Sequence, residues 1–389
     1  MFLYTRSLEI KDETVSHRRF FHQNAEVGLE MPLACKYVSD ELKKLGLSPK
    51  RCGKGICATV GTGGKTLLLR ADMDALPMAE QSGEEFACTS GKTAHTCGHD
   101  LHAAMLLSAA KLICEHKSEL NGTVKLMFQP AEETLQGCKN MVDAGVLNDP
   151  KPDGALAFHV APGKIPLGIY MYNAGGVMMN SSDGFRVEIR GKGGHGAYPN
   201  LAIDPINIAT HIYLSLKTLI STEVDPMATC TLSIGKIQAG ETYNVIPDSA
   251  VLEGSLRTND PATREKMVKR IRKICEQTAE MFGGSAEVSD LANVPPLVCN
   301  KAFTEQMVSY IEELDVPNLR GIANMSASAS EDFAVIAEQI PSAFIYLSAG
   351  FEDERGEYSA HNPKVRFNEE ALPIGTAMMA HCALRWLSK

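Results

Sequence analysis

The pattern of apolar and turn-forming residues changes twice along this chain of 389 residues, near Tyr172 and near Pro295. In the first part, short apolar runs that predict buried strands alternate with stretches whose apolar residues recur at three- and four-residue steps, as in helices. Because strands that alternate with helices tend to pair in parallel, this part predicts an α/β sheet. The strand-like runs are 65–70, 124–128 and 154–158, and the helical stretches are 30–47, 102–115 and 137–145.

Between the two changes, apolar and polar residues alternate at 185–189, 229–237 and 250–257. This alternation predicts strands with one face in water, which is typical of an antiparallel sheet. Helical patterns at 205–220 and 261–282 lie among these strands. The order of strands and helices predicts a small two-layer α+β unit of ferredoxin-like type.

After Pro295-Pro296 the first pattern returns. We therefore expect an α/β main domain that is interrupted by a smaller α+β domain. The expected boundaries are 1–180 for the first part of the main domain, 181–293 for the inserted domain and 294–389 for the second part of the main domain.

Charge and cysteine content restrict the partners and the compartment. The formal net charge is −9, which argues against a nucleic-acid backbone or an anionic membrane as a partner. We see neither a secretory signal pattern nor an apolar stretch of membrane-spanning length. Eleven cysteines are scattered from Cys35 to Cys382 without the dense spacing of a secreted disulfide scaffold. We therefore expect reduced thiols in a cytoplasmic protein.

Residue types that bind metal ions follow the predicted strands, where open α/β sheets bind ligands. A single histidine is more often a hydrogen-bonded structural residue than a ligand, and two adjacent glutamates usually lie on a solvated surface. Cysteine close to histidine is more indicative, because thiolate and imidazole both suit a borderline-soft divalent ion. Adjacent carboxylates after a buried strand allow one to bind metal while the other carries protons. The candidates are Asp72 and Asp74, His95, Cys97 and His99, Glu132 and Glu133, His159 and His361.

Three further residues carry weaker signals. His195 lies in the glycine-rich segment 191–197, which a simple turn would explain equally well. Asn244 and Arg257 could be ordinary loop and strand-end residues. The segment 61–66 is not a phosphate-binding loop, because residue 59, where that motif requires glycine, is threonine.

Together these motifs resemble the M20 metallopeptidase family. The form Cys-Gly-His-Asp at 97–100 is similar to its amidohydrolase branch, which contains hippurate hydrolases, N-acyl-L-amino acid amidohydrolases, N-acetyldiaminopimelate deacetylases and auxin-conjugate hydrolases. The chain departs from the pattern at Asn24-Ala25-Glu26, where relatives often carry His-Pro before the glutamate. The matching motifs are Leu69 to Pro77, His95 to His102, Phe128 to Glu133, Gly191 to Pro199, Tyr243 to Pro247 and Ser330 to Phe333.

The resemblance implies a phosphorylase/hydrolase-like α/β catalytic domain with two divalent metal ions, and a lid domain that also forms a homodimer. Zinc suits the thiolate and imidazole ligands best, and manganese, cobalt or nickel are compatible. The resemblance implies that Glu132 is the general base and that Asp74 steadies the site. It places His195 and Asn244 at the carbonyl oxygen of the substrate and Arg257 at its carboxylate. The implied metal ligands are Cys97, which would bridge the ions, His99, Glu133, His159 and His361.

The expected activity is hydrolysis of the amide bond of an N-acyl amino acid with an acetyl, benzoyl or similar acyl group, by attack of metal-bound water with Glu132 as general base. A metallo-dipeptidase or carboxypeptidase with the same site is the alternative, because its substrates also present an amide near a carboxylate. A non-catalytic metal- or ligand-binding protein is a remoter alternative. A binding module has no need of a base such as Glu132 beside Glu133.

Overall fold

The computed structural model describes residues 3–388, which form two compact units. The first unit consists of the described residues up to Met178, of Val298–Ser326 and of the residues from Asp332 onward. The second unit consists of Met179–Leu297 and the short segment Ala327–Glu331. The range 181–293 indicated by the sequence lies within the second unit, whereas 327–331 falls in the range that the sequence pattern places with the main domain.

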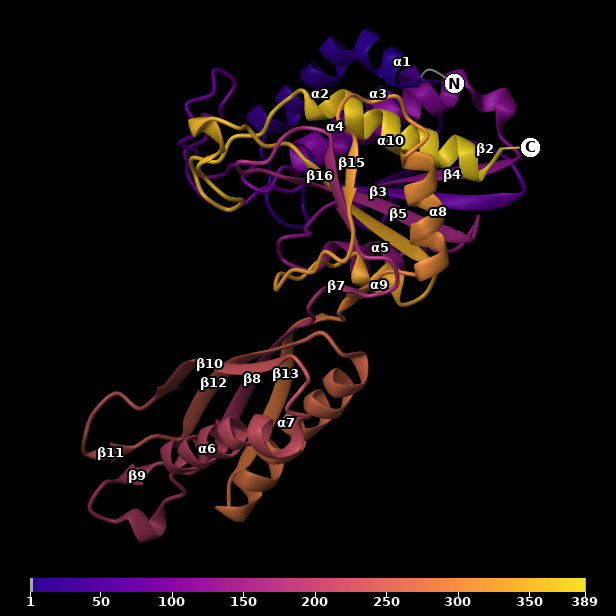
Figure 1. Ribbon diagram of the computed structural model, residues 1–389. Helices are drawn as coiled ribbons and strands as arrows, with labels where there is room; N and C mark the ends of the chain where they lie inside the picture. The colour runs from indigo at the N-terminus through magenta and orange to yellow at the C-terminus, as the bar shows by residue number, and fades with distance from the viewer. Residues whose placement is uncertain (1–2, 389) are drawn as a thin grey trace. The chain divides into compact units, whose positions relative to one another are not determined.

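The first unit contains an eight-stranded sheet with the strand order β1-β2-β4-β3-β5-β16-β6-β15 (Figure 1). The four central strands β4, β3, β5 and β16 pair in parallel, as the alternation of strands and helices predicts. Antiparallel pairs flank them, so the sheet is mixed rather than wholly parallel. The strands are β1 (Lys50–Cys52), β2 (Gly55–Gly61), β3 (Lys65–Asp72), β4 (Gly122–Gln129), β5 (Gly154–Ala161), β6 (Ile169–Tyr172), β15 (Arg320–Ile322) and β16 (Ser342–Ser348).

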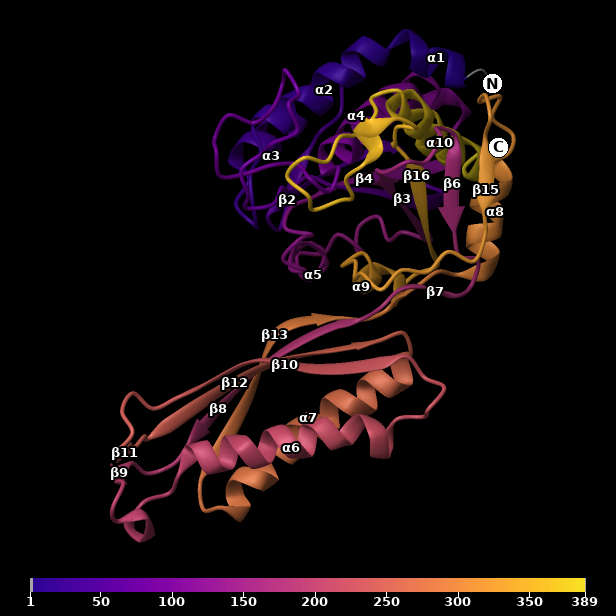
Figure 2. The ribbon, with the colours of Figure 1, turned by 60° about the vertical axis from the view of Figure 1, so that its left-hand side comes forward.

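Helices cover both faces of this sheet (Figures 1 and 2). Helices α4 and α10 pack against each other on one face with α1 and α2 beside them, and α5 and α9 lie on the other face. Both α4 and α10 are buried on nearly all sides, which explains why their sequences are apolar around most of the helix. The helices are α1 (Leu3–Glu9), α2 (Lys11–Gln23), α3 (Pro32–Lys44), α4 (His99–Glu115), α5 (Gly137–Asp143), α8 (Lys301–Ile311), α9 (Ala334–Ala337) and α10 (Ala371–Trp386), with 3-10 turns at Lys117–Glu119 and Glu354–Gly356.

The second unit is a four-stranded antiparallel sheet with the strand order β10-β12-β8-β13 and two helices. Counted along the chain, this order is 2-3-1-4, which with the intervening helices is the ferredoxin-like arrangement predicted from the sequence. Asp260 accepts a hydrogen bond from the backbone N–H of Thr263 at 2.7 Å and so caps the start of α7. The elements are β8 (Ser182–Arg190), β9 (Gly194–His195), a 3-10 turn at Pro199–Leu201, α6 (Pro205–Glu223), β10 (Cys230–Ala239), β11 (Val245–Ile246), β12 (Ser249–Thr258), α7 (Pro261–Met281) and β13 (Ser285–Val294).

The chain passes between the two units at β7 (Val177–Met179) and β14 (Leu297–Val298), which pair with each other. Across residues 3–388, every helix is too short or too polar to span a lipid bilayer.

Candidate metal centre

The side chains with metal-binding chemistry lie at the carboxyl ends of the central strands of the first unit. These ends meet at one edge of the sheet, which is why residues far apart in sequence converge there. His159 lies within β5, whereas the sequence pattern places it just after that strand. The side chains are Asp72 and Asp74 at the end of β3, Cys97 and His99 at the start of α4, Glu132 and Glu133 after β4, His159 on β5 and His361 after β16.

The five side chains that the sequence analysis names as ligands form two overlapping groups. The ligand atoms of Cys97, His99 and His159 lie within 4.8 Å of one another. Those of Cys97, Glu133 and His361 satisfy the same limit. Cys97 belongs to both groups, which is the position that a bridging ligand requires.

The ring orientation of two histidines is fixed by hydrogen bonds to backbone oxygens. His99 donates from Nδ1 to the backbone oxygen of Asp74 at 2.9 Å, and His159 donates from Nδ1 to that of Val160 at 2.8 Å. Each ring therefore directs Nε2 into the site, and Nε2 of His159 lies 3.5 Å from the sulfur of Cys97. This pattern is typical of metal-binding histidines, whose second nitrogen is held by a backbone or carboxylate oxygen.

Two buried polar atoms at the centre of the site lack hydrogen bonds. His99 Nε2 and Glu133 Oε1 have no hydrogen-bond partner among the described residues. Glu133 Oε1 lies 3.9 Å from His99 Nε2 and 3.5 Å from His361 Nε2. Buried polar atoms are nearly always hydrogen-bonded, so two such atoms without partners fit side chains that meet at a common cation.

The electrostatic surroundings also favour a cation. Burial alone would lower the pKa of His99, but Asp72 and Cys97 outweigh it and hold that pKa well above its usual value. Burial raises the pKa of the Cys97 thiol to about 12, so a thiolate there needs a nearby positive charge. Burial and the neighbouring histidines His102 and His99 hold the pKa of His159 well below its usual value, which keeps that ring neutral, as a ligand must be. The donor set therefore fits a divalent metal ion.

Asp74 holds the segment that carries the two glutamates. Its Oδ1 accepts a hydrogen bond from the backbone N–H of Glu132, and its Oδ2 accepts one from that of Glu133, each at 3.0 Å. The segment is not extended, because the flanking residues Ala131 and Leu135 have left-handed φ angles of 54° and 56°. Such backbone costs about 1–3 kcal/mol per residue and is concentrated at functional sites. Carboxylate oxygens of Glu132 and Glu133 lie within 4.8 Å of each other and of a ring nitrogen of His99.

His361 is tied to the same region from the other end of the chain. Its backbone N–H donates to the oxygen of Thr96 at 2.9 Å, and its φ angle is 65°. Its side chain is about half exposed, with 54% of its surface accessible, so it lies at the solvent side of the site.

Sequence reasoning missed the layer of residues behind the ligands. His102 donates from Nδ1 to Asp72 Oδ1 at 2.5 Å and accepts at Nε2 from the backbone N–H of Val160 at 2.8 Å. Both nitrogens are engaged, so His102 supports the site and is not a ligand, although it lies close to His99. Arg70 donates to the other oxygen of Asp72 at 2.6 Å. One sequence signal could have indicated that His102 lies next to the proposed ligands. It is the spacing of His99 and His102, which places the two residues one helical turn apart.

In the second unit, His195 and Asn244 come together and Arg257 lies elsewhere. Strands β9 and β11 pair with His195 opposite Val245, and the backbone N–H of Gly196 donates to the oxygen of Asn244 at 2.9 Å. Arg257 lies near the far end of β12, where its guanidinium donates to Ser330 Oγ.

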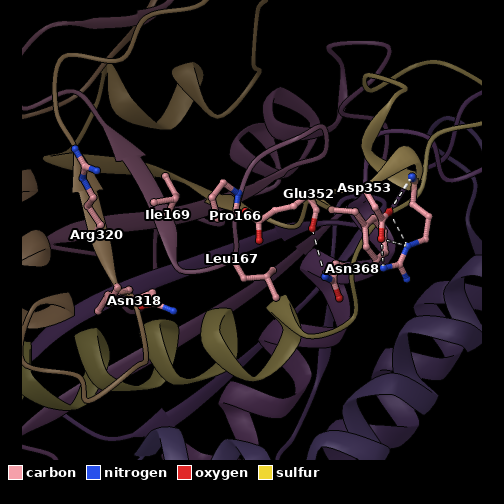
Figure 3. Close-up of a pocket in the computed structure, with 12 residues that line it drawn as sticks. Pro166, Leu167, Ile169, Asn318, Arg320, Glu352, Asp353 and Asn368 are labelled. Atoms are coloured by element: carbon pink, nitrogen blue, oxygen red, sulfur yellow. Dashed lines mark hydrogen bonds and ion pairs between the residues drawn. The ribbon is translucent and has the colours of Figure 1, made fainter.

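A surface cavity of about 870 Å³ in the first unit is built from other residues (Figure 3). Arg320 and Asp353 lie at opposite ends of its lining (Figure 3). Arg355 donates to both carboxylate oxygens of Asp353, at 2.9 and 2.6 Å, so its charge is already paired. Of the described residues that line the cavity, none belongs to the metal-binding groups.

Known proteins resemble this chain over nearly its whole length. IAA-amino acid hydrolase ILR1-like 2 of Arabidopsis thaliana is 36% identical over 99% of this chain and 88% of its own length. Hippurate hydrolase of Campylobacter jejuni is 33% identical over 100% of both chains. Thermostable carboxypeptidase 2 of Saccharolobus solfataricus is 32% identical over 98% of this chain and 97% of its own length.

Solved structures share the fold. A crystal structure from methicillin-resistant Staphylococcus aureus aligns with a TM-score of 0.92 and 31% identity over 100% of both chains. A dinuclear metal-binding peptidase of the M20 family from Bacillus subtilis aligns with a TM-score of 0.79 and 28% identity over 97% of this chain and 99% of its own. The sequence profile of peptidase family M20/M25/M40 matches residues 68–385. The chain therefore belongs to peptidase family M20/M25/M40.

Proposed function

We propose that this protein is a metal-dependent amidohydrolase that cleaves the amide bond of N-acyl amino acids to a carboxylic acid and a free amino acid. The observation that carries the proposal is the pair of buried atoms without hydrogen-bond partners among the described residues, His99 Nε2 and Glu133 Oε1. The ligand atoms of these two residues and of the buried Glu132 lie within 4.8 Å of one another. The relatives named as hippurate hydrolase and as IAA-amino acid hydrolase support an acylated amino acid as the substrate.

We propose two divalent ions, zinc by preference. The residues that would hold them are Cys97, His99, Glu133, His159 and His361, and a solved relative that binds two metals supports this. Mixed sulfur, nitrogen and oxygen donors suit zinc, and manganese, cobalt or nickel are compatible. Bound divalent ions supply Lewis acidity and lower the pKa of water toward neutrality.

Glu132 would act as the general base. Its carboxylate takes a proton from the attacking water and passes it to the departing amine nitrogen, so one group serves both halves of the reaction. Asp74 keeps Glu132 in place by accepting a hydrogen bond from its backbone N–H, so this contact does not involve the carboxylate of Glu132.

His195 would donate a hydrogen bond to the carbonyl oxygen of the substrate. Its Nδ1 accepts from the backbone N–H of Ala197 at 3.0 Å, so the proton of the neutral ring is on Nε2. A preorganised donor of this kind is worth about 100-fold or more in rate. Asn244, on the paired strand, would assist at the same oxygen, and Arg257 would bind the substrate carboxylate.

A carboxypeptidase activity at the same site is the second candidate, because one relative carries that name. A purely metal-binding function is less favoured, since it gives Glu132 no role.

A substrate panel tests the proposed function. Metal-reconstituted protein should hydrolyse N-acetyl and N-benzoyl amino acids faster than dipeptides, and a chelator should abolish the activity until zinc or manganese is restored. Release of free amino acid is the measurement. Faster cleavage of dipeptides would favour the peptidase, and no metal-dependent turnover on any amide of the panel would contradict both.

We propose that the second unit forms a homodimer through the open edge of β10. This strand pairs on one side with β12, and apolar side chains on and near it, such as Ile237, Leu214 and Tyr243, are exposed. An open strand edge beside exposed apolar residues is the kind of surface that a second copy covers.

A charge on the β10 edge should give a monomer. Ile237→Glu is expected to sediment at half the mass of the wild type in analytical ultracentrifugation, because the carboxylate would be buried in the interface. The matched control is Leu291→Glu on β13, the opposite edge of the sheet, since Leu291 is 52% exposed and Ile237 is 51% exposed. Equal masses for both variants would contradict this interface.

We propose a reducing, cytoplasmic compartment for the protein. Within the described part of the chain all eleven cysteines are free thiols, and a thiolate ligand such as Cys97 needs reducing surroundings. The partners that the proposed hydrolysis requires are small-molecule N-acyl amino acids.

A further inference from the structure

Two basic side chains of helix α2 are buried against the start of α4. Arg18 is only 1% exposed, and its Nε donates to Asp100 Oδ2 at 3.0 Å. His22 donates from Nδ1 to the same oxygen at 2.9 Å. Asp100 follows His99 directly, so the hydrogen bonds from Arg18 and His22 hold the residue next to a proposed metal ligand.

The other side of the His22 ring contacts the segment that leads into Cys97. His22 donates from Nε2 to Glu80 Oε1 at 2.8 Å, and the backbone N–H of Cys88 donates to Glu80 Oε2 at 2.7 Å. Leu76 and Ala94 pair in an isolated bridge, which closes the segment between them into a loop. His22 therefore joins the loop before Cys97 to the helix that begins with His99.

Charge balance requires His22 to be an imidazolium. Both of its nitrogens face carboxylate oxygens, which only accept hydrogen bonds, so both must carry a proton. Burial lowers the pKa of His22, but the hydrogen bonds to Asp100 and Glu80 outweigh it and raise the pKa to about 9. His95, whose ring centroid is 6.1 Å away, adds no charge, because burial lowers its pKa to about 4. The two cations Arg18 and His22 thus face the carboxylates of Asp100 and Glu80, and Arg18 Nη1 also lies 3.2 Å from Glu369 Oε1.

We infer that His22, supported by Arg18, is a positioning residue for the metal ligands Cys97 and His99. The inference rests on the proposed metal site and extends it to a helix that precedes residue 68, where the match to the family profile begins. Removing one member of a buried charge network leaves its partner uncompensated, so the loop and the helix start would relax apart. Residues that hold ligands in place typically contribute about 10- to 100-fold to metal affinity.

The test is the affinity of the folded protein for zinc, measured by competition with a chromophoric chelator. His22→Gln should weaken binding by about 10- to 100-fold, because glutamine is neutral and cannot donate to both carboxylates. His17→Gln is the matched control, since His17 lies on the same helix, is 6% exposed against 4% for His22, and bonds to Tyr37 Oη at 2.8 Å. The control should bind zinc within about twofold of the wild type, since its contacts lie away from the ligands.

Glu80→Gln is the second variant, in case His22→Gln does not fold. It keeps the size of the side chain and removes the negative charge of the carboxylate that faces Nε2 of His22. It should therefore weaken zinc binding, as His22→Gln does. Far-UV circular dichroism of the metal-free proteins confirms that each variant compared is folded.

The stability of the metal-free wild type should also depend on pH through His22. The pKa of His22 is higher in the folded state than in the unfolded state, where it is about 6.5. The stabilisation of the folded state by His22 is therefore complete below about pH 6.5, the unfolded pKa. The contribution is lost as the pH rises to about 9. Urea unfolding should show a decrease in stability between these pH values that is smaller in His22→Gln, and an equal decrease in both proteins would overturn the charge assignment.

The outcomes separate this inference from the proposed function. Wild-type zinc affinity in folded His22→Gln and Glu80→Gln would overturn the inference and leave the metal site standing. An equal loss in His17→Gln would also overturn it, because the effect would then belong to the helix as a whole. A wild-type protein that binds no divalent ion would overturn the metal site itself and the inference with it.

Discussion

Glu132→Gln is expected to lower the rate of hydrolysis by about 100- to 10,000-fold while the metal content stays near that of the wild type. The amide has the size of the carboxylate but cannot take a proton from water at neutral pH. The backbone N–H of Glu132, not its side chain, bonds to Asp74, so the local turn should persist. Steady-state kinetics on the best substrate of the panel and elemental analysis of the same sample give both quantities.

The control for this variant is Glu352→Gln. Glu352 lines the surface cavity of Figure 3 rather than the metal-binding groups, so its replacement should leave turnover unchanged. Full activity in Glu132→Gln would show that another group carries the proton. Loss of metal together with activity would assign Glu132 to the ligands instead.

Cys97→Ala should lose bound metal as well as activity. Cys97 belongs to both ligand groups, so its removal weakens the site toward each ion and not toward one alone. Metal ions per chain after gel filtration should fall from about two, the number a dinuclear site holds, toward zero. Turnover should fall to background in the same preparation.

Cys88→Ala is the matched control for the cysteine variant. Cys88 is 7% exposed against 8% for Cys97 and lies nine residues earlier on the same connection, where its thiol contacts Ser90. Alanine keeps the backbone N–H that Glu80 accepts, so metal and activity should both be retained. Retention of two ions by Cys97→Ala would contradict the assignment of the thiolate.

Much of the fold follows from local pattern. The helices α6 and α7 begin where Asp204 and Asp260 cap them, and each of these aspartates is followed by a proline, so local chemistry is enough to predict their starts. The hairpin of β1 and β2 is absent from the sequence prediction. Its strands are short, and β2 is held by hydrogen bonds to β4, which lies more than 60 residues later. Tertiary pairing of this kind leaves little trace in a local window.

The alternation of strands and helices was sufficient to predict the fold class, and the motifs at the ends of the strands resembled the family, a resemblance that implied the five candidate ligands. Only the tertiary structure decided which nitrogen of each histidine is directed into the site and which buried atoms lack a partner. It also decided that His102 supports the site while His99 can bind metal, although both lie on the first turn of α4. The physical reason is that these roles depend on hydrogen bonds between distant segments, such as those from His22 to Asp100 and from the backbone N–H of Glu132 to Asp74. A sequence specifies the donors and acceptors, but which of them meet is settled when the strands and helices pack.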